Sequence, residues 1–505
     1  MRRFPKETSF SYFHPYGEKP QWDAAQEEWR RRYESLYLSG KKRGDVVMTT
    51  ETIAAIASGL THAGIGIIRI SGPDALQVGD RVVTLKNGKA IAAVPTHTVH
   101  YGLAHEGEEV LDEILAVVMR APHSFTGEDV VELQCHGGPL IMRRLLDAVL
   151  HQGARLAEPG EFTRRAFLNG RMDLSQAEAV MDLIHSQNEF ARKASIEQLQ
   201  GQVSEKVKKL REKILYQLAF IEAALDDPEH ISTEGYQEEL NGLLDPLIRE
   251  LDVLLKDAGS SRILADGVRT VILGRPNAGK SSLLNLLVGE ERAIVTDIAG
   301  TTRDTLEENI PLGGISLRLV DTAGIRETED QIEQMGVERA KAQAEKADLL
   351  IHMVDASRPL AQEEDEIFRI LQGKRAVILM NKSDLTAAVD AETVREKAPG
   401  VPVLTFSARE GIGKDALEKT ILDMFDAGEI GKRSSVTITN LRHKDALEHA
   451  RDSLCMVKQS IADGMPEDFY SIDLMEAYRQ LGLIIGESVE DDLVNEIFAK
   501  FCMGK

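Results

Sequence analysis

The sequence predicts a multidomain protein: an α+β domain first, then an all-α helical domain split into two segments, with a doubly wound α/β domain inserted between those segments. Three observations predict this order. Short β-rich runs alternate with helix-like segments up to about residue 159, long segments of helical period follow, and the same helical pattern returns near residue 442. A length of 505 residues gives each part enough chain for a core of its own.

Residues 1–47 differ in composition from the rest of the chain. They contain both tryptophans, Trp22 and Trp29. The simplest explanation is an upstream in-frame extension, with Met48 as the natural start, so we expect an atypical leader. Residues 48–160 are expected to form the α+β domain, with β-rich runs at 65–70, 98–103, 113–118 and 130–134 and a helix-like segment at 139–150.

Residues 161–261 and 431–505 are expected to be the two segments of one helical domain. Apolar residues recur at helical period, with few turn residues, over 175–185, 190–225, 236–255, 442–463 and 468–482. The interval 262–430 is then an inserted domain. Insertion is tolerated where the termini of the inserted part lie close together.

The inserted interval contains a phosphate-binding loop. The segment 274–281, GRPNAGKS, fits the pattern G-x-x-x-x-G-K-[ST] between a strand-like run at 268–273 and a helix-like run at 282–288. In such a loop the backbone N–H groups close around phosphates, Lys280 lies near the β- and γ-phosphate oxygens, and the Ser281 hydroxyl holds Mg²⁺. We therefore expect the chain to bind a nucleoside triphosphate.

A second motif selects the base. Asn381-Lys382-Ser383-Asp384 follows the buried-strand run 376–380. Asp384 can accept from guanine N1–H and the exocyclic amine together, and adenine offers no such pair of donors. Ser407-Ala408, with Arg409 after them, supply the backbone contact to the guanine oxygen that this fold usually places there.

Two segments between these motifs are expected to respond to the γ-phosphate. Residues 301–304, TTRD, have a threonine pair suited to closing over Mg²⁺, with Thr302 as a ligand. Residues 321–324, DTAG, place Asp321 to hold Mg²⁺ through water and the Gly324 N–H to contact the γ-phosphate. Four motifs in this order predict a GTPase, whose expected GTP-binding residues are Asn277, Ala278, Gly279, Lys280, Ser281, Ser282, Thr296, Asp297, Ile298, Ala299, Gly300, Thr301, Thr302, Asp321, Thr322, Ala323, Gly324, Asn381, Lys382, Asp384, Ser407, Ala408 and Arg409.

One position departs from the common GTPase scheme. Ile325 stands where a glutamine would orient the attacking water, and an isoleucine cannot do so. The acidic residues just downstream, Glu327, Glu329, Asp330 and Glu333, either supply a water-orienting carboxylate or form a solvated loop surface. The residues themselves leave both interpretations open.

Composition restricts the classes of protein. A formal net charge of −22 argues against non-specific coating of nucleic acid, which requires a basic surface. No apolar run reaches the ~20 residues needed to span a bilayer, and a cytoplasmic location is expected. The three cysteines have no metal-ligand spacing. Of these, Cys135 is expected in the core, despite the neighbouring His136, and Cys455 is expected to pack within a helix.

These motifs resemble those of the MnmE (TrmE) family, the GTPase subunit of a tRNA wobble-uridine modification enzyme. The resemblance runs from about residue 48 to residue 505 and has no counterpart for the leader. The segments that carry it are 66–72, 125–129, 159–167, 274–282, 296–304 and the ending 501–505, which contains a C-x-G-K motif.

The resemblance implies an N-terminal domain that binds a tetrahydrofolate derivative and forms a homodimer. The positions that match the folate contacts of the family are Arg69, Glu132, Arg171 and Lys505. Arg171 replaces the lysine of relatives, so a planar fork stands in place of a point charge. Cys502 is either a catalytic thiol presented toward folate or tRNA, or a structural cysteine near the chain end, and the resemblance favours the catalytic role.

The resemblance also implies that a potassium ion replaces the arginine finger when two GTPase domains pair across the dimer. The matching potassium ligands are Asn277, Thr296, Ile298 and Thr301. The matching water-orienting acid is Glu333.

Two functions of different classes remain. The first is a modification enzyme that joins a folate one-carbon unit and an amine at C5 of the wobble uridine of tRNA, with an FAD-bearing MnmG-like partner completing a heterotetramer. GTP hydrolysis then drives opening and closing rather than bond formation. The second is a regulatory GTPase of the ribosome-assembly type, which needs neither folate nor Cys502. Residues 48–159 and the C-terminal motif favour the first.

Overall fold

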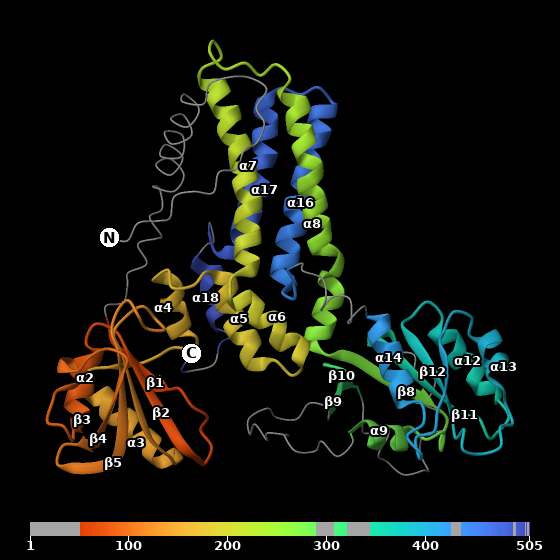
Figure 1. Ribbon diagram of the computed structural model, residues 1–505, viewed down its shortest axis with the longest axis horizontal. Coiled ribbons are helices and arrows are strands. Elements are labelled where there is room, and N and C mark those ends of the chain that lie inside the picture. Colours follow the sequence, from red (N-terminus) through yellow and green to blue (C-terminus); the bar gives the residue numbers. More distant parts are fainter. Residues whose placement is uncertain are drawn as a thin grey trace.

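Three parts of the chain, each built on its own hydrophobic core, make up the computed structural model (Figure 1). The structure describes residues 51–288, 308–320, 344–425, 436–487, 491–499, 501 and 504. The expected multidomain fold class is confirmed: an α+β domain, a helical domain and an inserted α/β domain. The leader 1–47 lies outside the described residues.

The N-terminal domain is a mixed sheet covered by helices on one face. Its strands are β1 (Ile53–Ile56), β2 (Ala63–Ser71), β3 (Val83–Leu85), β4 (Thr98–Glu106), β5 (Glu109–Met119), β6 (Val130–Gly137) and β7 (Arg155–Leu156), in the order β3-β4-β5-β6-β2-β1-β7. The helices are α2 (Ala75–Val82) and α3 (Pro139–His151), with a short 3₁₀ turn, η2 (Ile91–Ala93). Side chains alternate along each strand, so Ile68 and Ile70 are buried under the helices while Arg69 lies on the opposite face.

The helical domain is a bundle of long helices with shorter helices at its base. The long helices are α7 (Gln202–Asp226), α8 (Tyr236–Asp266), α16 (Leu441–Ala462) and α17 (Glu467–Ile485), which share one apolar core. At the base lie α4 (Glu161–Leu168), α5 (Leu174–His185), α6 (Glu189–Leu199) and α18 (Asp491–Ala499). Helix α8 continues beyond residue 262, the expected start of the inserted domain, to Asp266.

The segment 190–225, expected as one helical stretch, is two helices. Helix α6 ends at Leu199 and α7 begins at Gln202. Gly201 between them has φ of 88°, in the left-handed region that favours glycine. A periodic apolar pattern continues across such a break, which is why periodicity alone did not reveal it.

A buried ion pair joins the two segments of the helical domain. Glu178 on α5 is 7% exposed and receives hydrogen bonds from Arg442 Nε and NH2 at 2.9 and 2.7 Å. The ring of His443 approaches the same carboxylate at 2.8 Å. Arg442 and His443 stand in the first turn of α16, where the chain returns from the inserted domain.

The inserted domain is a sheet with helices on both faces. Its strands are β8 (Val268–Gly274), β9 (Glu308–Leu312), β10 (Ile315–Leu319), β11 (Leu349–Asp355), β12 (Ala376–Asn381) and β13 (Val403–Thr405), in the order β13-β12-β11-β8-β10-β9. Among the described strands of this sheet, only β9 pairs antiparallel. Its helices are α9 (Lys280–Val288), α12 (Gln362–Leu371), α13 (Ala391–Lys397) and α14 (Lys414–Met424). Separate apolar clusters cover the two faces, which explains the continuous hydrophobic runs of β11 and β12.

In Figure 1 the N-terminal and inserted domains lie on opposite sides of the bundle base, with α5 and α6 between them and α18 beside α4. Among the described residues, no helix is long and apolar enough to cross a membrane.

Candidate functional site

The phosphate-binding loop joins β8 to α9. Lys280 Nζ donates to the carbonyl oxygens of Gly274 and Arg275 at 2.6 and 2.9 Å, so its ammonium lies within the loop. Burial lowers the pKa of Lys280 below its ordinary value. Ser281 and Ser282 are exposed in the first turn of α9, where the N-terminus of a helix favours anions.

Asn277 lies at the turn of this loop with φ of 61°. Asparagine tolerates this left-handed conformation better than most residues. The side chain is exposed, and an amide oxygen is a type of ligand that binds metal cations.

Asn381, at the end of β12, connects the phosphate-binding loop to the base-binding loop. Its Nδ2 donates to Ala278 O at 2.7 Å, and its Oδ1 accepts from Ala408 N at 3.0 Å. A Cβ on Gly279 would overlap Asn381 Nδ2. One buried side chain therefore fixes the distance between the two ends of the site, a role that the sequence motif did not reveal.

Asp384 is held by the hydroxyl of Ser407. Ser407 Oγ donates to Asp384 Oδ1 at 2.6 Å and lowers the pKa of Asp384. The group is therefore an ionised acceptor, as guanine recognition requires. Next to it, Lys382 Nζ pairs with Asp355 Oδ2 at 2.6 Å, and Arg409 is 84% exposed.

The remaining residues expected around the nucleotide lie outside the described residues; they are Thr296, Asp297, Ile298, Ala299, Gly300, Thr301, Thr302, Asp321, Thr322, Ala323, Gly324 and Glu333. The hairpin of β9 and β10 connects the two expected switch segments, because β9 follows the first and β10 precedes the second. Within the described ranges, no group of His, Cys, Asp and Glu could hold a metal. A Mg²⁺ ion held by Ser281 and nucleotide phosphates needs no such group.

The N-terminal domain places Arg69 and Glu132 side by side on the face of its sheet that α2 and α3 leave uncovered. They are register partners on β2 and β6, and Arg69 Nε donates to Glu132 Oε1 at 2.8 Å. The Arg69 guanidinium also lies 5.5 and 5.6 Å from the ring centroids of Phe125 and Phe162. These contacts fix the orientation of a charged pair that remains partly exposed.

The C-terminal tail docks beside this pair. Arg69 NH1 donates to Gly504 O at 3.3 Å. Gly504 has φ of 88°, and a Cβ there would overlap Ile56 O and lie 2.9 Å from Ala57 Cα. Phe501 packs against Phe498 and Gly160. The structure thus brings the chain end to two of the predicted folate-contact residues, while Cys502 and Lys505 lie outside the described residues.

Arg171 is exposed after α4. Its Nε donates to Ser124 O at 3.4 Å, and Ser124 precedes the Phe125 whose ring lies against Arg69. Arg171, also expected to contact folate, therefore borders the same region, and its planar guanidinium donates to a backbone carbonyl.

A buried ion network behind this region was missed by the sequence reasoning. Glu161, 1% exposed, receives hydrogen bonds from Arg155 NH2 at 2.7 Å and from Arg165 NH2 at 2.9 Å. Arg165 also reaches Glu128 at 3.2 Å. Burial opposes ionisation of Glu161, but the hydrogen bonds from Arg155, from Glu158 N and from Arg165 outweigh it and lower its pKa to about 2. Arg165 is therefore a buried link between α4 and the N-terminal domain.

The described cysteines have different environments. Cys135 is 3% exposed, and burial raises the pKa of its thiol to about 11, so the expectation of a core cysteine is confirmed. Cys455 is exposed on α16, and the expectation that it packs within the bundle is wrong. It follows Leu454 of the buried stripe and points away from it.

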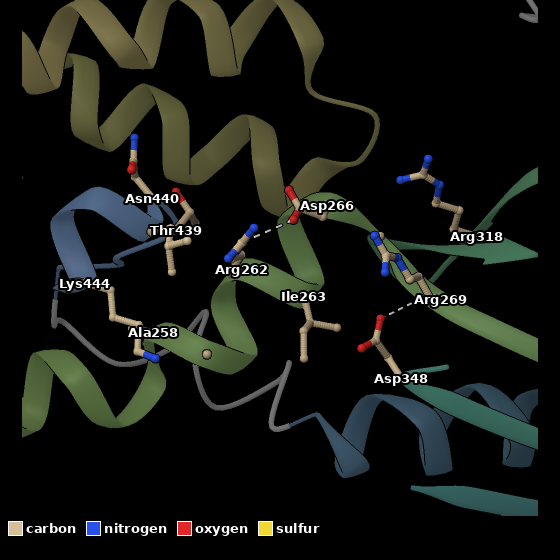
Figure 2. Close-up of a pocket in the computed structure, with 13 residues that line it drawn as sticks. Ala258, Arg262, Ile263, Asp266, Arg269, Arg318, Asp348, Thr439, Asn440 and Lys444 are labelled. Atoms are coloured by element: carbon tan, nitrogen blue, oxygen red, sulfur yellow. Dashed lines mark hydrogen bonds and ion pairs between the residues drawn. The ribbon is translucent and has the colours of Figure 1, made fainter. Parts of the chain in front are cut away.

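A cavity of about 280 Å³ lies between the helical and inserted domains and contains none of the predicted site residues. Figure 2 shows Arg262 and Asp266 of α8, Lys444 of α16 and the strand residues Arg269 and Arg318 around it. Arg262 pairs with Asp266 at 3.4 Å. The cavity lies between the two domains, next to the point where the chain passes from α8 into β8.

Comparisons with known proteins agree with this architecture. The model of the GTP-binding protein TrmE N-terminus matches residues 52–171, and that of the MnmE helical domain matches residues 174–502. The tRNA modification GTPase MnmE of Lachnoclostridium phytofermentans is 54% identical over 459 residues, which cover 91% of this chain and 100% of the relative. The protein of the same name from Geobacillus kaustophilus is 45% identical over 458 residues, covering 90% and 99% of the two chains.

A solved G domain of the T. maritima FeoB iron transporter is 25% identical and covers 31% of this chain and 98% of its own, with a TM-score of 0.24 that carries no weight for the fold. The two family models together span most of the described chain, and the sequence identity extends over the full length of a relative. The chain therefore belongs to the MnmE family of tRNA modification GTPases.

Proposed function

We propose that this chain is a potassium-activated GTPase that modifies C5 of the wobble uridine in tRNA with a one-carbon unit from a tetrahydrofolate derivative. It acts as a homodimer together with an FAD-bearing, MnmG-like protein in a heterotetramer. Residues 48–160 bind the folate and dimerise, 161–261 and 431–505 form the helical domain, and 262–430 hydrolyse GTP. Membership in a family of tRNA modification GTPases supports the overall role.

The docked C-terminal tail is the observation that carries the folate proposal. Gly504 contacts Arg69, which pairs with Glu132 on the sheet face. A folate derivative has a pterin with neighbouring donors at N3–H and the 2-amino group, so the Glu132 carboxylate, held in place by Arg69, can accept from both. A regulatory GTPase has no use for a chain end held at such a pair.

The GTPase proposal assigns separate tasks to the two loops that Asn381 joins. Lys280 and the helix N-terminus bind the phosphates, Ser281 and Thr302 hold Mg²⁺, and Asp384 reads guanine. The potassium ligands are Asn277, Thr296, Ile298 and Thr301. This ion supplies positive charge to the transition state in the absence of an arginine finger.

Glu333 orients the attacking water in this proposal. Glu333→Ala should bind GTP normally and lose ~10²–10⁴ in hydrolysis rate, the usual effect of removing a proton-handling group. Glu327→Ala and Glu329→Ala are matched controls in the same acidic stretch. If all three variants lose activity equally in single-turnover assays at saturating GTP and potassium, the stretch acts only through its general charge.

Folate binding tests the first half of the proposal. We expect the full chain to bind 5-formyltetrahydrofolate in calorimetric titration, and Arg69→Ala to weaken binding at least tenfold. Arg81→Ala, on α2 of the same domain, is the control. A full chain that hydrolyses GTP and binds no folate would instead favour the regulatory GTPase.

A further inference from the structure

Helix α5 connects the two candidate sites of the chain. Its N-terminal half packs into an apolar cluster with α18 and the C-terminal tail, through Leu174 and Ala177 against Phe498 and Phe501. With its 12 residues it spans about 18 Å. Its other end leads into the connection 186–188, which contacts the inserted domain.

Asn188 lies at this contact and uses both of its side-chain polar atoms in hydrogen bonds. Its Oδ1 accepts from Ala191 N at 2.8 Å and caps α6. Its Nδ2 donates to Leu264 O at 2.9 Å, in the last turn of α8, and approaches Ser316 Oγ on β10 at 3.2 Å. One amide thus ties the start of α6, the end of α8 and the hairpin strand β10 together.

Two residues near Asn188, Gln187 and Phe190, also form hydrogen bonds with this hairpin. Phe190 N donates to Gly314 O, in the turn between β9 and β10, at 3.0 Å, and the Phe190 ring packs on the core of the inserted domain. Asn309 Nδ2 on β9 donates to Gln187 Oε1 at 2.6 Å. This hairpin connects the two expected switch segments. A change in the conformation of either segment would therefore act on the hairpin, which the helical domain contacts.

Hydrogen bonds cap the start of α5 and join it to the neighbouring helices α6 and α7. Asp173 and Gln176 form a capping box at the start of α5. Gln198 Nε2 of α6 donates to Ser175 O at 2.7 Å, and Ser175 Oγ lies 3.0 Å from Ser204 Oγ of α7. Near the end of α8, the cavity of about 280 Å³ lined by Arg262, Asp266 and Lys444 lies between the two domains (Figure 2).

We propose that α5, together with Asn188 and Phe190 at the start of α6, is the structural path that couples the nucleotide to the folate site. Through it, the nucleotide bound to the inserted domain acts on the hairpin β9–β10 and repositions α18 and the C-terminal tail. Asn188 is a positioning residue: it touches neither ligand and acts through the strand it holds. The proposal rests on the proposed GTPase and folate functions and adds the path that couples them.

The test measures the coupling itself. In the full chain with potassium, amide hydrogen exchange in α18 is compared between the GDP state and the state with GDP and aluminium fluoride. We expect the exchange rates to differ at least fivefold between these states in the unsubstituted chain. Asn188→Ser keeps a capping oxygen and loses the two amide donations, so the ratio should fall below twofold while GDP affinity stays within twofold.

Two further variants make the outcome decisive. Ser316→Ala removes one partner from the opposite side of the contact and should reduce the ratio as Asn188→Ser does. Arg192→Ala, on the exposed face of α6 where it pairs with Glu189, should leave the ratio unchanged. A purely structural role of Asn188 would alter exchange equally in both states and would leave their ratio intact.

The proposed path is overturned if Asn188→Ser and Ser316→Ala both keep the full ratio. It is also overturned if the unsubstituted chain binds and hydrolyses GTP normally but shows the same α18 exchange in both states. A chain that binds no guanine nucleotide refutes the proposed GTPase instead, and nucleotide titration of the same samples separates these results.

Discussion

Gly504→Ala should release the C-terminal tail from the N-terminal domain. Two costs add at this position. An L-residue in the left-handed region costs about 1–2 kcal/mol, and Gly504 has φ of 88°. The added Cβ would also overlap Ile56 O and approach Ala57 Cα at 2.9 Å. Both atoms belong to backbone at the end of β1 and just beyond it, so neither can move aside as a flexible side chain would.

Release of the tail also removes the hydrogen bond from Arg69 to Gly504 O. A hydrogen bond to a charged group contributes about 1.5–3 kcal/mol. The backbone cost alone, about 1–2 kcal/mol, lowers the ratio of docked to undocked tail by roughly 5- to 30-fold. The overlap of the added Cβ with Ile56 O lowers this ratio further.

Limited digestion by carboxypeptidase, followed by mass spectrometry of the intact chain, measures docking directly. We expect Gly504→Ala to lose C-terminal residues at least tenfold faster and to bind 5-formyltetrahydrofolate more weakly. Gly464→Ala is a matched control, since Gly464 has φ of 68° and nothing within 4 Å of an added Cβ. Equal digestion rates for Gly504→Ala and the unsubstituted chain would refute the close approach of tail and sheet.

Three further predictions concern single side chains. Asp384→Asn should shift base preference from guanine toward xanthine, because an amide both donates and accepts; competition binding with GDP and XDP checks this, and unchanged selectivity would show that another residue reads the base. Asn277→Ala should abolish the faster GTP turnover in potassium than in sodium while GDP affinity stays nearly constant; equal rates in the two salts for the unsubstituted chain would remove the potassium assignment. Glu161→Gln should destabilise the fold by about 3 kcal/mol at pH 7, since the folded pKa of about 2 lies below the ordinary 4.5. This contribution is full above pH 4.5 and is lost as the pH falls toward 2, so urea unfolding at pH 3 should show less than half of the difference; a pH-independent difference would mean that packing, not charge, is at work.

The sequence predicted the elements that carry a local signal. The strands that lead into Gly274 and Asn381 and the helix after Lys280 lie where the motif context placed them, because nucleotide-binding loops require a strand before and a helix after them. Cys455 was misplaced for an equally local reason. Cysteine behaves as a small apolar residue, which favours a buried position. Cys455, however, stands one residue after the buried stripe that Ala450 and Leu454 define on α16.

The contacts that build the sites could not be predicted in this way. Gly504 meets Ile56, and Asn188 meets Ser316, across separations that no periodic pattern records. The same holds for Arg165, which looks like one member of an exposed basic pair until Glu128 and Glu161 are brought around it. A charged side chain reveals its burial only through its partners, and those partners are distant in the sequence.

The division of the helical domain into two segments has a consequence for synthesis of the chain. Helices α7 and α8 leave the ribosome well before α16 and α17, which complete their shared core. Roughly 170 residues separate them, and at about 5–20 residues per second their translation takes on the order of 10–30 s. At the end of that interval the core that α7 and α8 share with α16 and α17 is still incomplete, while all the described strands of the inserted domain have been made. The inserted domain can therefore fold before the helical domain is complete. The core of the helical domain then forms next to an inserted domain that has already folded.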